Sequence, residues 1–518
     1  MIPSQVEKEE SDEEERYLLY TAEEKKVDTK PAGIMEADAG EMSSSKSSLL
    51  DIQIETVKTE PSPASGYDLI AVGAGPAGLF AAYEVVKHNR AHPNKRLQML
   101  IIEKGKSIET RKKSEVMCGV GGAGTFSDGK LHFTPVLSHE KMLHLYSMPE
   151  YQTYLDYVDK IFTEFGVTAP YFPKDQKEVE GMVDECKKHG IQLFIRRTRH
   201  VGSDILPEII KNFTDYLIKN GIEFMTETYV DDVVIDDKVC IGVKLDTGKE
   251  ILADNVLLAP GRYNAKWLQE LCKRYNIEFA YEKVEVGVRV EFPSIIMKKY
   301  ADVMYESIFR VYTNTFDDPI RTFCPCPNGM VATEEYEGFV CVNGHSKSDH
   351  KSENSNFAFV TEINLTEPVE NTILYGKSIA LLATTIGGGM PIVQRLEDLK
   401  CGRRSTAARL SKSFITPTLK EAVPGDISMA LPHRVVTNIK EGLAKLDAVM
   451  PGINSSNTLL YAPEIKLRSS KIVTDRHLQT LTVKNLYVAG DGAGVAGNIV
   501  GAAATGLIAA RGIIEKIQ

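Results

Sequence analysis

Short apolar runs that suit buried strands alternate with helical patterns at both ends of the folded part of the chain. The run from Tyr67 to Val72 is followed by a glycine turn, by a helical stretch over 77–88 and by a second apolar run over 97–102. Runs of this length without polar alternation are typical of parallel strands that are covered on both faces. The opening pattern therefore predicts a βαβ unit.

The middle of the chain has a different pattern. Residues 138–189 are helical in character, and a further helix is expected from a cap at Asp204 to Asn220. Strand-like runs separated by turn residues follow, and the last forty residues return to strand, turn and helix. The expected strands in this region are 192–195, 222–228, 230–236, 239–245, 250–258, 284–292, 306–313, 339–342 and 356–365.

This order predicts an α/β protein with a Rossmann-like nucleotide-binding domain assembled from discontinuous segments and an inserted α+β substrate domain. The expected division is a disordered acidic tail (1–65), a first nucleotide-binding segment (66–137), a helical insertion (138–200), a second segment (201–280), the substrate domain (281–430) and a third segment (431–518).

Charge is concentrated in the first 65 residues. They hold sixteen acids and seven bases, so the net charge of −10 leaves about −1 for the remainder. The acidic run and serine clusters of this tail bury too little apolar surface to fold, and the near-neutral remainder argues against a nucleic-acid partner. Eight scattered cysteines without a CxxC pair, together with the absence of a signal peptide or membrane span, predict a soluble cytoplasmic protein.

Gly73-Ala-Gly75-Pro-Ala-Gly78 joins the first strand to the first helix. The first glycine permits a tight turn, the second lets backbone approach a diphosphate, and the third lets helix and strand pack closely. The diphosphate then lies at the positive end of the helix. Glu103 ends the second strand, where an acid can accept hydrogen bonds from ribose hydroxyls; a surface glutamate is the alternative reading.

Two later strands end in similar turns. One ends at Gly261, and the other runs from Leu486 to Gly490-Asp491-Gly492, with a small-residue helix beginning near Ile499. Asp491 could bind ribityl hydroxyls of a flavin. The N-terminal amides of the following helix would then stabilise negative charge on a reduced flavin ring.

Together these segments resemble the FAD-binding fold of the glutathione-reductase superfamily. Further motifs resemble a poorly characterised family of FAD-dependent dehydrogenases, and these are Cys118 to Leu131, Cys324-Pro-Cys326, Val342 to Ser346, Leu460 to Ile465 and Gly490 to Gly494. Members often carry Arg-Gly where this chain has Gly497-Asn498. The resemblance implies FAD without naming a substrate. The expected cofactor-binding residues are Gly73, Gly75, Pro76, Ala77, Gly78, Glu103, Lys104, Arg111, Gly121, Gly122, Gly261, Asp491, Gly492 and Ile499.

The glycine-rich loop from Gly119 to Gly129 can expose consecutive amides to phosphate or flavin oxygens, although a merely flexible loop is the alternative. We interpret Cys324-Pro-Cys326 as packed or turn cysteines in preference to a redox or metal site. The Gly387-Gly-Gly389 turn could approach the ring or be a tight turn, and Ile392 stands where a second dinucleotide fingerprint needs glycine. We therefore expect no separate NAD(P)H domain and no metal site.

A bound flavin exchanges hydride itself, so no protein nucleophile is required. Polar residues beside glycine turns are candidates for substrate contact, and they are Lys130, His132, His345, Arg395 and His433. The leading hypothesis is an FAD-dependent dehydrogenase or reductase of a small organic molecule, with NAD(P)H as a transient donor. A flavin monooxygenase, a non-catalytic scaffold and a flavin-dependent RNA-modifying enzyme are the alternatives, and the near-neutral charge disfavours the last.

Overall fold

The computed structural model describes residues 66–518, except 113, 114, 116, 128, 136–141, 203, 204, 337, 346–350, 366–370 and 467–469. The predicted acidic tail and the predicted helix cap Asp204 lie outside the described residues. Within the described part, no helix is both long enough and apolar enough to cross a membrane.

A five-stranded parallel sheet collects strands from distant parts of the chain. Its order is β23-β11-β1-β2-β7, and every neighbouring pair runs parallel. All strands but β7 are fully buried, as expected for apolar runs covered on both faces. The discontinuous Rossmann-like fold is thus confirmed. The strands are β1 (Leu69–Val72), β2 (Met99–Ile102), β7 (Glu223–Met225), β11 (Val256–Leu258) and β23 (Leu486–Val488).

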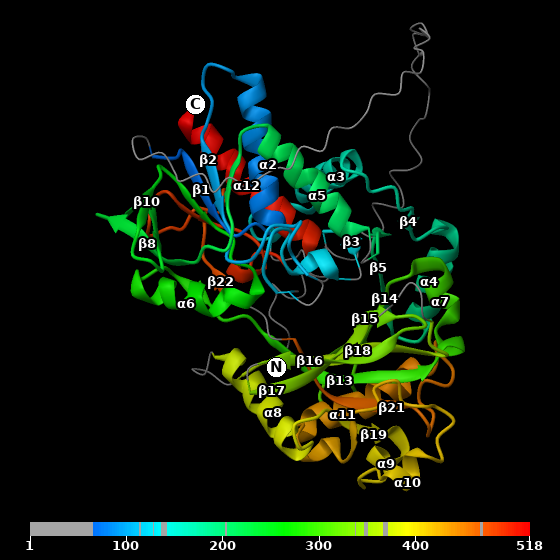
Figure 1. Cartoon of the computed structure of the whole chain (residues 1–518). Helices are drawn as coiled ribbons and strands as arrows, with labels where there is room; N and C mark the ends of the chain where they lie inside the picture. The colour runs from blue at the N-terminus through cyan, green and yellow to red at the C-terminus, as the bar shows by residue number, and fades with distance from the viewer. Residues whose placement is uncertain are drawn as a thin grey trace, which may run out of the picture. The chain divides into compact units, whose positions relative to one another are not determined.

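Helices cover one side of this sheet, where Figure 1 shows α2 (Pro76–Ala91) beside α12 (Ile499–Ile517). The two helices cross very closely, because a Cβ at Gly506 would lie 2.0 Å from the Ala77 carbonyl oxygen. Helices α2 and α12, from opposite ends of the described chain, are therefore packed as one layer. Helices α3 (Met148–Glu164) and α5 (Leu206–Lys219) contact this layer.

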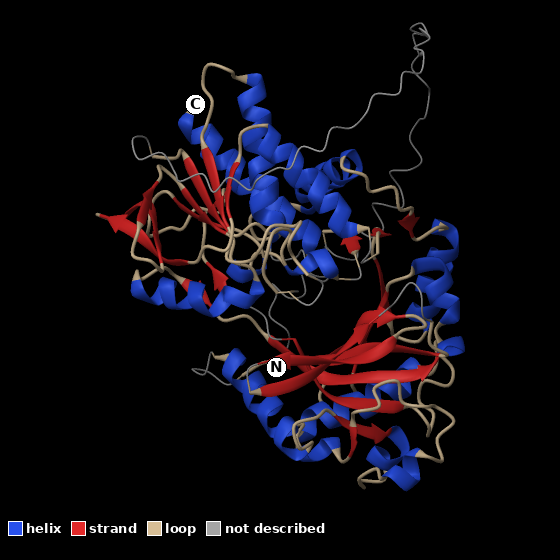
Figure 2. Cartoon of the chain, viewed as in Figure 1, coloured by secondary structure: helices blue, strands red, loops and turns tan. Residues whose placement is uncertain are grey.

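An eight-stranded sheet forms the second core, with helices packed beneath it in Figure 2. Its order is β20-β19-β21-β13-β18-β15-β14-β5, and its neighbours are antiparallel except β19 and β20. The strands are β5 (Gln192–Ile195), β13 (Val284–Pro293), β14 (Ser307–Tyr312), β15 (Pro319–Cys326), β18 (Asn354–Ile363), β19 (Ile392–Arg395), β20 (Val423–Pro424) and β21 (Leu459–Lys466).

Smaller elements complete the described chain. The small sheets are β3 (Lys130–His132) with β4 (Tyr171–Phe172) and β6 (Thr198–His200); β8 (Val230–Asp236) with β9 (Val239–Leu245) and β10 (Glu250–Leu252); β12 (Phe279–Ala280) with β22 (Lys471–Ile472); and the hairpin β16 (Met330–Tyr336) with β17 (Phe339–His345). The other α-helices are α4 (Gln176–Lys188), α6 (Ala265–Arg274), α7 (Lys298–Met304), α8 (Thr372–Ile386), α9 (Leu396–Lys400), α10 (Ala407–Leu410) and α11 (His433–Leu446).

The structure differs from the predicted boundary at residue 431. Helix α11 packs against β13 and β18, and β21 pairs with β13 and β19. Residues 431–466 therefore lie with the eight-stranded sheet, and we place the return to the parallel sheet after Lys466. The expected strand 250–258 is also divided, since β10 pairs antiparallel with β9 whereas β11 joins the parallel sheet.

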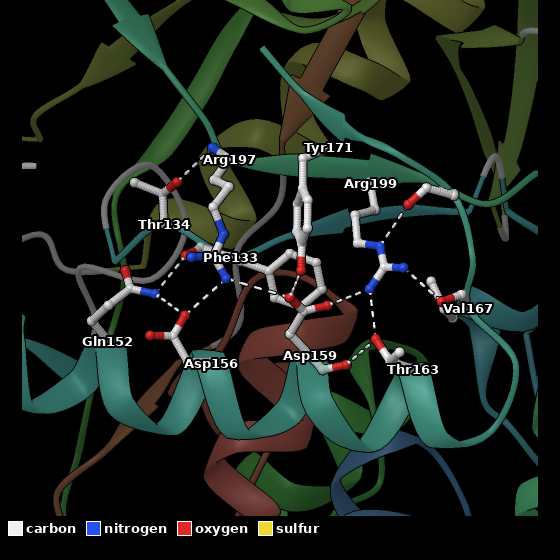
Figure 3. A network of polar contacts seen from close by, with 11 residues as sticks. Phe133, Thr134, Gln152, Asp156, Asp159, Thr163, Val167, Tyr171, Arg197 and Arg199 are labelled. Atoms are coloured by element: carbon white, nitrogen blue, oxygen red, sulfur yellow. Dashed lines mark hydrogen bonds and ion pairs between the residues drawn. The ribbon is translucent and has the colours of Figure 1, made fainter. Parts of the chain in front are cut away.

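A buried ion pair fastens β6 to α3 (Figure 3). The Arg199 guanidinium donates to Asp159 at 2.8 Å, to the Thr163 hydroxyl at 2.7 Å and to the Val167 carbonyl at 2.6 Å. Tyr171 donates to the same aspartate from β4. Since β6 pairs with β3, this clamp also fixes the position of β3, which carries Lys130 and His132.

Candidate functional site

A cavity of about 90 Å³ lies at the carboxyl ends of β1, β2 and β11. This edge of a parallel sheet is where ligands bind in open α/β folds. Its lining includes six of the residues predicted to bind a cofactor, namely Gly73, Gly75, Glu103, Lys104, Gly122 and Gly261. The structure thus brings together residues from four separate stretches of the sequence.

The glycine turn has the geometry that its spacing predicts. Gly73 has a φ of +109°, and a Cβ there would lie 2.2 Å from the Ala259 carbonyl oxygen. A Cβ at Gly78 would lie 2.1 Å from the Gly73 carbonyl oxygen. A Cβ at Gly75 would meet only the Gly122 Cα, at 3.8 Å, so the space in front of Gly75 is open to a ligand.

Helix α2 begins in this open space. Gly75 is its N-cap and Pro76 its first residue, with no side-chain cap. The amides of Ala77 and Gly78 have no intrahelical acceptor, because they belong to the first turn. An anion in front of Gly75 would meet these amides and the positive end of the helix dipole.

Glu103 lies in the cavity wall and organises the surrounding backbone. Its carboxylate accepts hydrogen bonds from the amides of Ala74 (2.9 Å), Gly105 (2.8 Å) and Gly119 (2.9 Å). An ionised carboxylate offers about four acceptor positions, so one is left for a ligand hydroxyl. Glu103 therefore joins the glycine turn to the Gly119–Gly129 loop in addition to its predicted role.

The loop itself is held down by Arg111. This buried guanidinium donates to the carbonyls of Gly119 (3.2 Å) and Val120 (2.8 Å) and to the Thr125 hydroxyl (3.3 Å). Arg111 does not line the cavity, and the structure gives it the part of a loop anchor. Gly122 does line the cavity, whereas the neighbouring Gly121 donates to the Ala74 carbonyl at 2.8 Å.

Asp491 begins the turn after β23 and pairs with Arg262, which lines the cavity. The Arg262 Nη2 atom lies 2.9 Å from Asp491 Oδ2, and this carboxylate raises the pKa of Arg262. The other oxygen, Asp491 Oδ1, is buried without a hydrogen-bond partner among the described residues. Gly492 packs so closely that a Cβ would lie 2.5 Å from the Gly261 carbonyl oxygen.

The start of α12 lies beside the glycine-rich loop. A Cβ at Gly124 would meet the Ile499 side chain at 2.7 Å. Asn498 caps the helix by accepting from the Gly501 amide at 2.9 Å. One of the backbone amides predicted to face the flavin ring is therefore already bonded to Asn498. Ile499 supplies an apolar contact to the loop.

Lys130 and His132 lie on β3 and belong to a buried cluster of titratable groups that also contains Arg196 and Glu306. His132 Nε2 lies 3.0 Å from Glu306 Oε2, and Arg196 Nη1 lies 3.6 Å from the same oxygen. Burial lowers the pKa of His132, so the ring is neutral at neutral pH. Burial alone would raise the pKa of Glu306, but the charges of His132, Lys130 and Arg196 hold it below its usual range. At neutral pH, where His132 is neutral, the charges of Lys130 and Arg196 hold the pKa of Glu306 below its usual range.

The remaining candidates lie elsewhere. His345 is exposed at the end of β17, and His433 is exposed at the start of α11. Arg395 ends β19, beside Asp398 of α9, and Figure 1 shows this region well removed from α2 and β1. The structure does not bring Arg395 to the cavity. Gly387 to Gly389 form the tight turn that ends α8.

Sequence reasoning missed several side chains of the site. Arg262, Tyr263 and Trp267 line the cavity after Gly261, and Tyr229 lines it from the chain that leads into β8. Lys104 Nζ lies over the rings of Tyr229 (4.9 Å) and Tyr263 (5.4 Å). The position of Arg262 directly after a strand-ending glycine was the available signal.

Comparisons with known proteins agree with this geometry. Residues 68–282 match a model described as an FAD binding domain, and residues 283–467 match "FAD-dependent protein, C-terminal domain-like". Residues 418–518 match the model of glucose inhibited division protein A. An uncharacterized protein of Clostridium beijerinckii is 25% identical over 514 residues, covering 90% of this chain and 85% of the relative.

Solved structures with a similar fold are more distant. Glycine oxidase from Bacillus cereus is 13% identical, with a TM-score of 0.35 and coverage of 87% of this chain and 95% of the other. Quinol fumarate reductase of E. coli is 13% identical, with a TM-score of 0.39 and coverage of 87% and 70%. L-proline dehydrogenase from P. horikoshii is 12% identical, with a TM-score of 0.37 and coverage of 87% and 94%. We take nothing about the substrate from likenesses of this size.

The cavity fits the cofactor that these models describe. An open space lies before Gly75, Glu103 keeps an acceptor position, and Asp491 Oδ1 is buried without a partner among the described residues. The chain therefore contains an FAD binding domain over 68–282, followed over 283–467 by a region like the C-terminal domain of FAD-dependent proteins, and FAD is the cofactor that these models support.

Proposed function

We propose that the chain binds FAD in an extended form along the carboxyl edge of the parallel sheet. The adenosine would occupy the cavity beside Glu103, and the diphosphate would lie before Gly75 and Gly122. The ribityl chain would reach Asp491, and the ring would lie toward the start of α12 and β3. These two elements contact each other, which supports this direction.

One observation carries this proposal. Asp491 Oδ1 is buried and has no hydrogen-bond partner among the described residues, and Asp491 begins the turn after β23, the strand that pairs with β11. A buried carboxylate oxygen without a donor costs about 1–3 kcal/mol or more. A ribityl hydroxyl would donate to this oxygen and remove that cost. Arg262, held by the other oxygen, lies where it can also meet the diphosphate.

FAD, when bound, supplies hydride exchange with a small organic substrate. The chain's own residues bind and orient it. Arg111 and Glu103 hold the loop in place, and Lys130 and His132 of β3 offer polar groups beside the buried Arg196 and Glu306. The sequence carries one dinucleotide fingerprint, and we assign it to FAD. NAD(P)H, the proposed electron donor, would therefore bind transiently, without a domain of its own. Eight scattered cysteines without a CxxC pair favour a cytoplasmic setting.

The affinity for FAD tests the assignment of Asp491. Asp491→Asn keeps the size of the side chain but removes the charge, so we expect FAD to bind about tenfold to a hundredfold more weakly. Fluorescence quenching of added FAD measures the dissociation constant. Asp302→Asn, an exposed carboxylate paired with Lys298 on α7, is the matched control and should bind FAD as wild type does. Equal affinity in wild type and Asp491→Asn would place the ribityl chain elsewhere.

Anaerobic mixing separates the proposed activity from its alternatives. Bleaching of the flavin by NADH or NADPH without oxygen, followed by reoxidation by a substrate, is expected of a dehydrogenase or reductase. A monooxygenase would complete its turnover only when oxygen is admitted. A chain that binds no FAD at all would instead be a scaffold.

A further inference from the structure

Cys324-Pro325-Cys326 lies at an irregular point of β15. The pairing of β15 with β18 shifts register between Phe323 and Cys326, and Cys324 has a φ of +47°. Residues other than glycine adopt this left-handed conformation rarely, and such strain concentrates at functional sites. Cys326 Sγ lies 3.6 Å from the Cys324 carbonyl oxygen, so the turn folds the two residues against each other.

Positive groups surround this segment. Arg289 is fully buried, and its Nη2 atom donates to the Cys324 carbonyl at 2.7 Å and to Cys326 Sγ at 3.3 Å. Lys130 Nζ donates to the Pro325 carbonyl at 3.2 Å. Positive charge beside sulfur is the setting in which cysteines exchange disulfides.

Arg289 is also unusual in its partners. Its Nη1 atom makes no hydrogen bond among the described residues, and the nearest carboxylate oxygen, of Glu464, is 3.6 Å away. Both oxygens of Glu464 are buried without a hydrogen bond, although Lys466 lies 2.5 Å from one of them. Gly344 lies against this group, since a Cβ there would meet Arg289 at 1.8 Å and Cys326 Sγ at 2.6 Å. Arg289 Nη1 and the two Glu464 oxygens are thus polar atoms that lie buried near Cys326 Sγ without a hydrogen bond among the described residues.

A hydrogen bond on one side and a shared charge on the other relate the cysteine segment to the end of the proposed FAD site. On one side, Lys130 belongs to β3, which contacts α12 and follows the glycine-rich loop. On the other side, the charge of Glu334 on β16 acts on Arg262 of the FAD site and on Lys466 of the cluster. Asp491 and, after it, Tyr336 and Glu334 raise the pKa of Arg262. Burial lowers the pKa of Lys466, but Glu464 and Glu334 outweigh it and raise it.

We propose that Cys324 and Cys326 form a dithiol–disulfide couple that exchanges two electrons with the flavin. This inference rests on the proposed function, because it makes the couple an electron partner of the same site. In the oxidative direction the two S–H bonds break and one S–S bond forms. Both electrons and one proton pass to FAD, and the second proton passes to solvent. In the reverse direction reduced FAD reduces the disulfide.

Anaerobic titration of the air-oxidised, FAD-bound chain with dithionite counts the electrons. Wild type should take four electrons per flavin, since flavin and disulfide each take two. Cys324→Ser and Cys326→Ser should each take two. Cys401→Ser, which changes an exposed cysteine outside the cluster, is the control and should take four. Alkylation and mass spectrometry should find thiols at 324 and 326 only after reduction.

The outcomes are distinguishable. If wild type takes two electrons while its flavin bleaches fully, the cysteine couple is refuted and the FAD assignment stands. If the purified chain shows no flavin absorption even after added FAD, the proposed function fails and this inference fails with it. A serine variant that does not fold leaves the wild-type electron count as the deciding measurement.

Discussion

At the scale of single residues, Gly75 and Gly78 of the glycine turn have different roles, since a Cβ meets open space at the first and backbone at the second. Gly75→Ala adds a methyl group to open space, so the free energy of unfolding should fall by no more than about 1 kcal/mol while FAD binding is lost. Gly78→Ala, which drives a methyl group into the Gly73 carbonyl, should destabilise the chain by about 2–3 kcal/mol. Urea unfolding and flavin absorbance measure both. Retention of FAD by Gly75→Ala would contradict the proposed position of the diphosphate.

His132 makes stability depend on pH. Because burial lowers its pKa in the folded chain, the unfolded chain binds more protons as pH falls below about 6.5, and stability is lost in that direction. The lowered pKa of Glu306 adds a further loss at more acidic pH, where unfolded glutamate is protonated. His132→Gln removes the first effect, worth up to about 1.4 kcal/mol between pH 6.5 and 5.5.

Urea unfolding at pH 7 and 5.5 measures this difference. The exposed His345→Gln is the matched control and should keep the wild-type pH dependence. If His132→Gln also loses the same stability on acidification as wild type, the histidine is not the titrating group.

At the scale of elements, the clamp between α3 and β6 should be a strong stabilising contact. Asp159→Asn leaves the buried guanidinium of Arg199 without its counter-charge, and we expect a loss of about 3–5 kcal/mol in urea unfolding. Asp156→Asn, on the same helix, breaks an exposed pair with Arg197 and should cost less than about 1 kcal/mol. Equal losses of unfolding free energy in the two variants would show that burial does not strengthen the pair of Asp159 and Arg199.

The elements also show what local sequence can predict. Strands 230–236 and 239–245 were predicted with the bounds of β8 and β9, because their alternation and turn residues are local signals. The position of 431–466 depends on pairing with β13 and β19, more than 60 residues away, which no local pattern records. Likewise Glu103 and Asp491 stand at predictable strand ends, whereas Arg289 and Glu464 meet only through sheet pairing.

At the scale of the whole molecule, FAD should stabilise the chain, because its proposed site takes segments from both ends of the described residues 66–518. Free FAD at about a hundred times its dissociation constant should add about 2.7 kcal/mol to the free energy of unfolding. Thermal unfolding with increasing FAD measures this shift. Asp491→Asn should need proportionally more FAD for the same shift, and an unfolding temperature that does not respond to FAD would contradict binding to the folded chain.

The amount of flavin on the purified chain decides whether it binds FAD before Gly75. The visible spectrum of wild type, compared with that of Gly75→Ala at equal protein concentration, gives the ratio of FAD to chain. We expect about one FAD per chain in wild type and almost none in the folded variant. A wild-type chain that stays colourless after incubation with FAD, or a variant that keeps its full flavin, would contradict it.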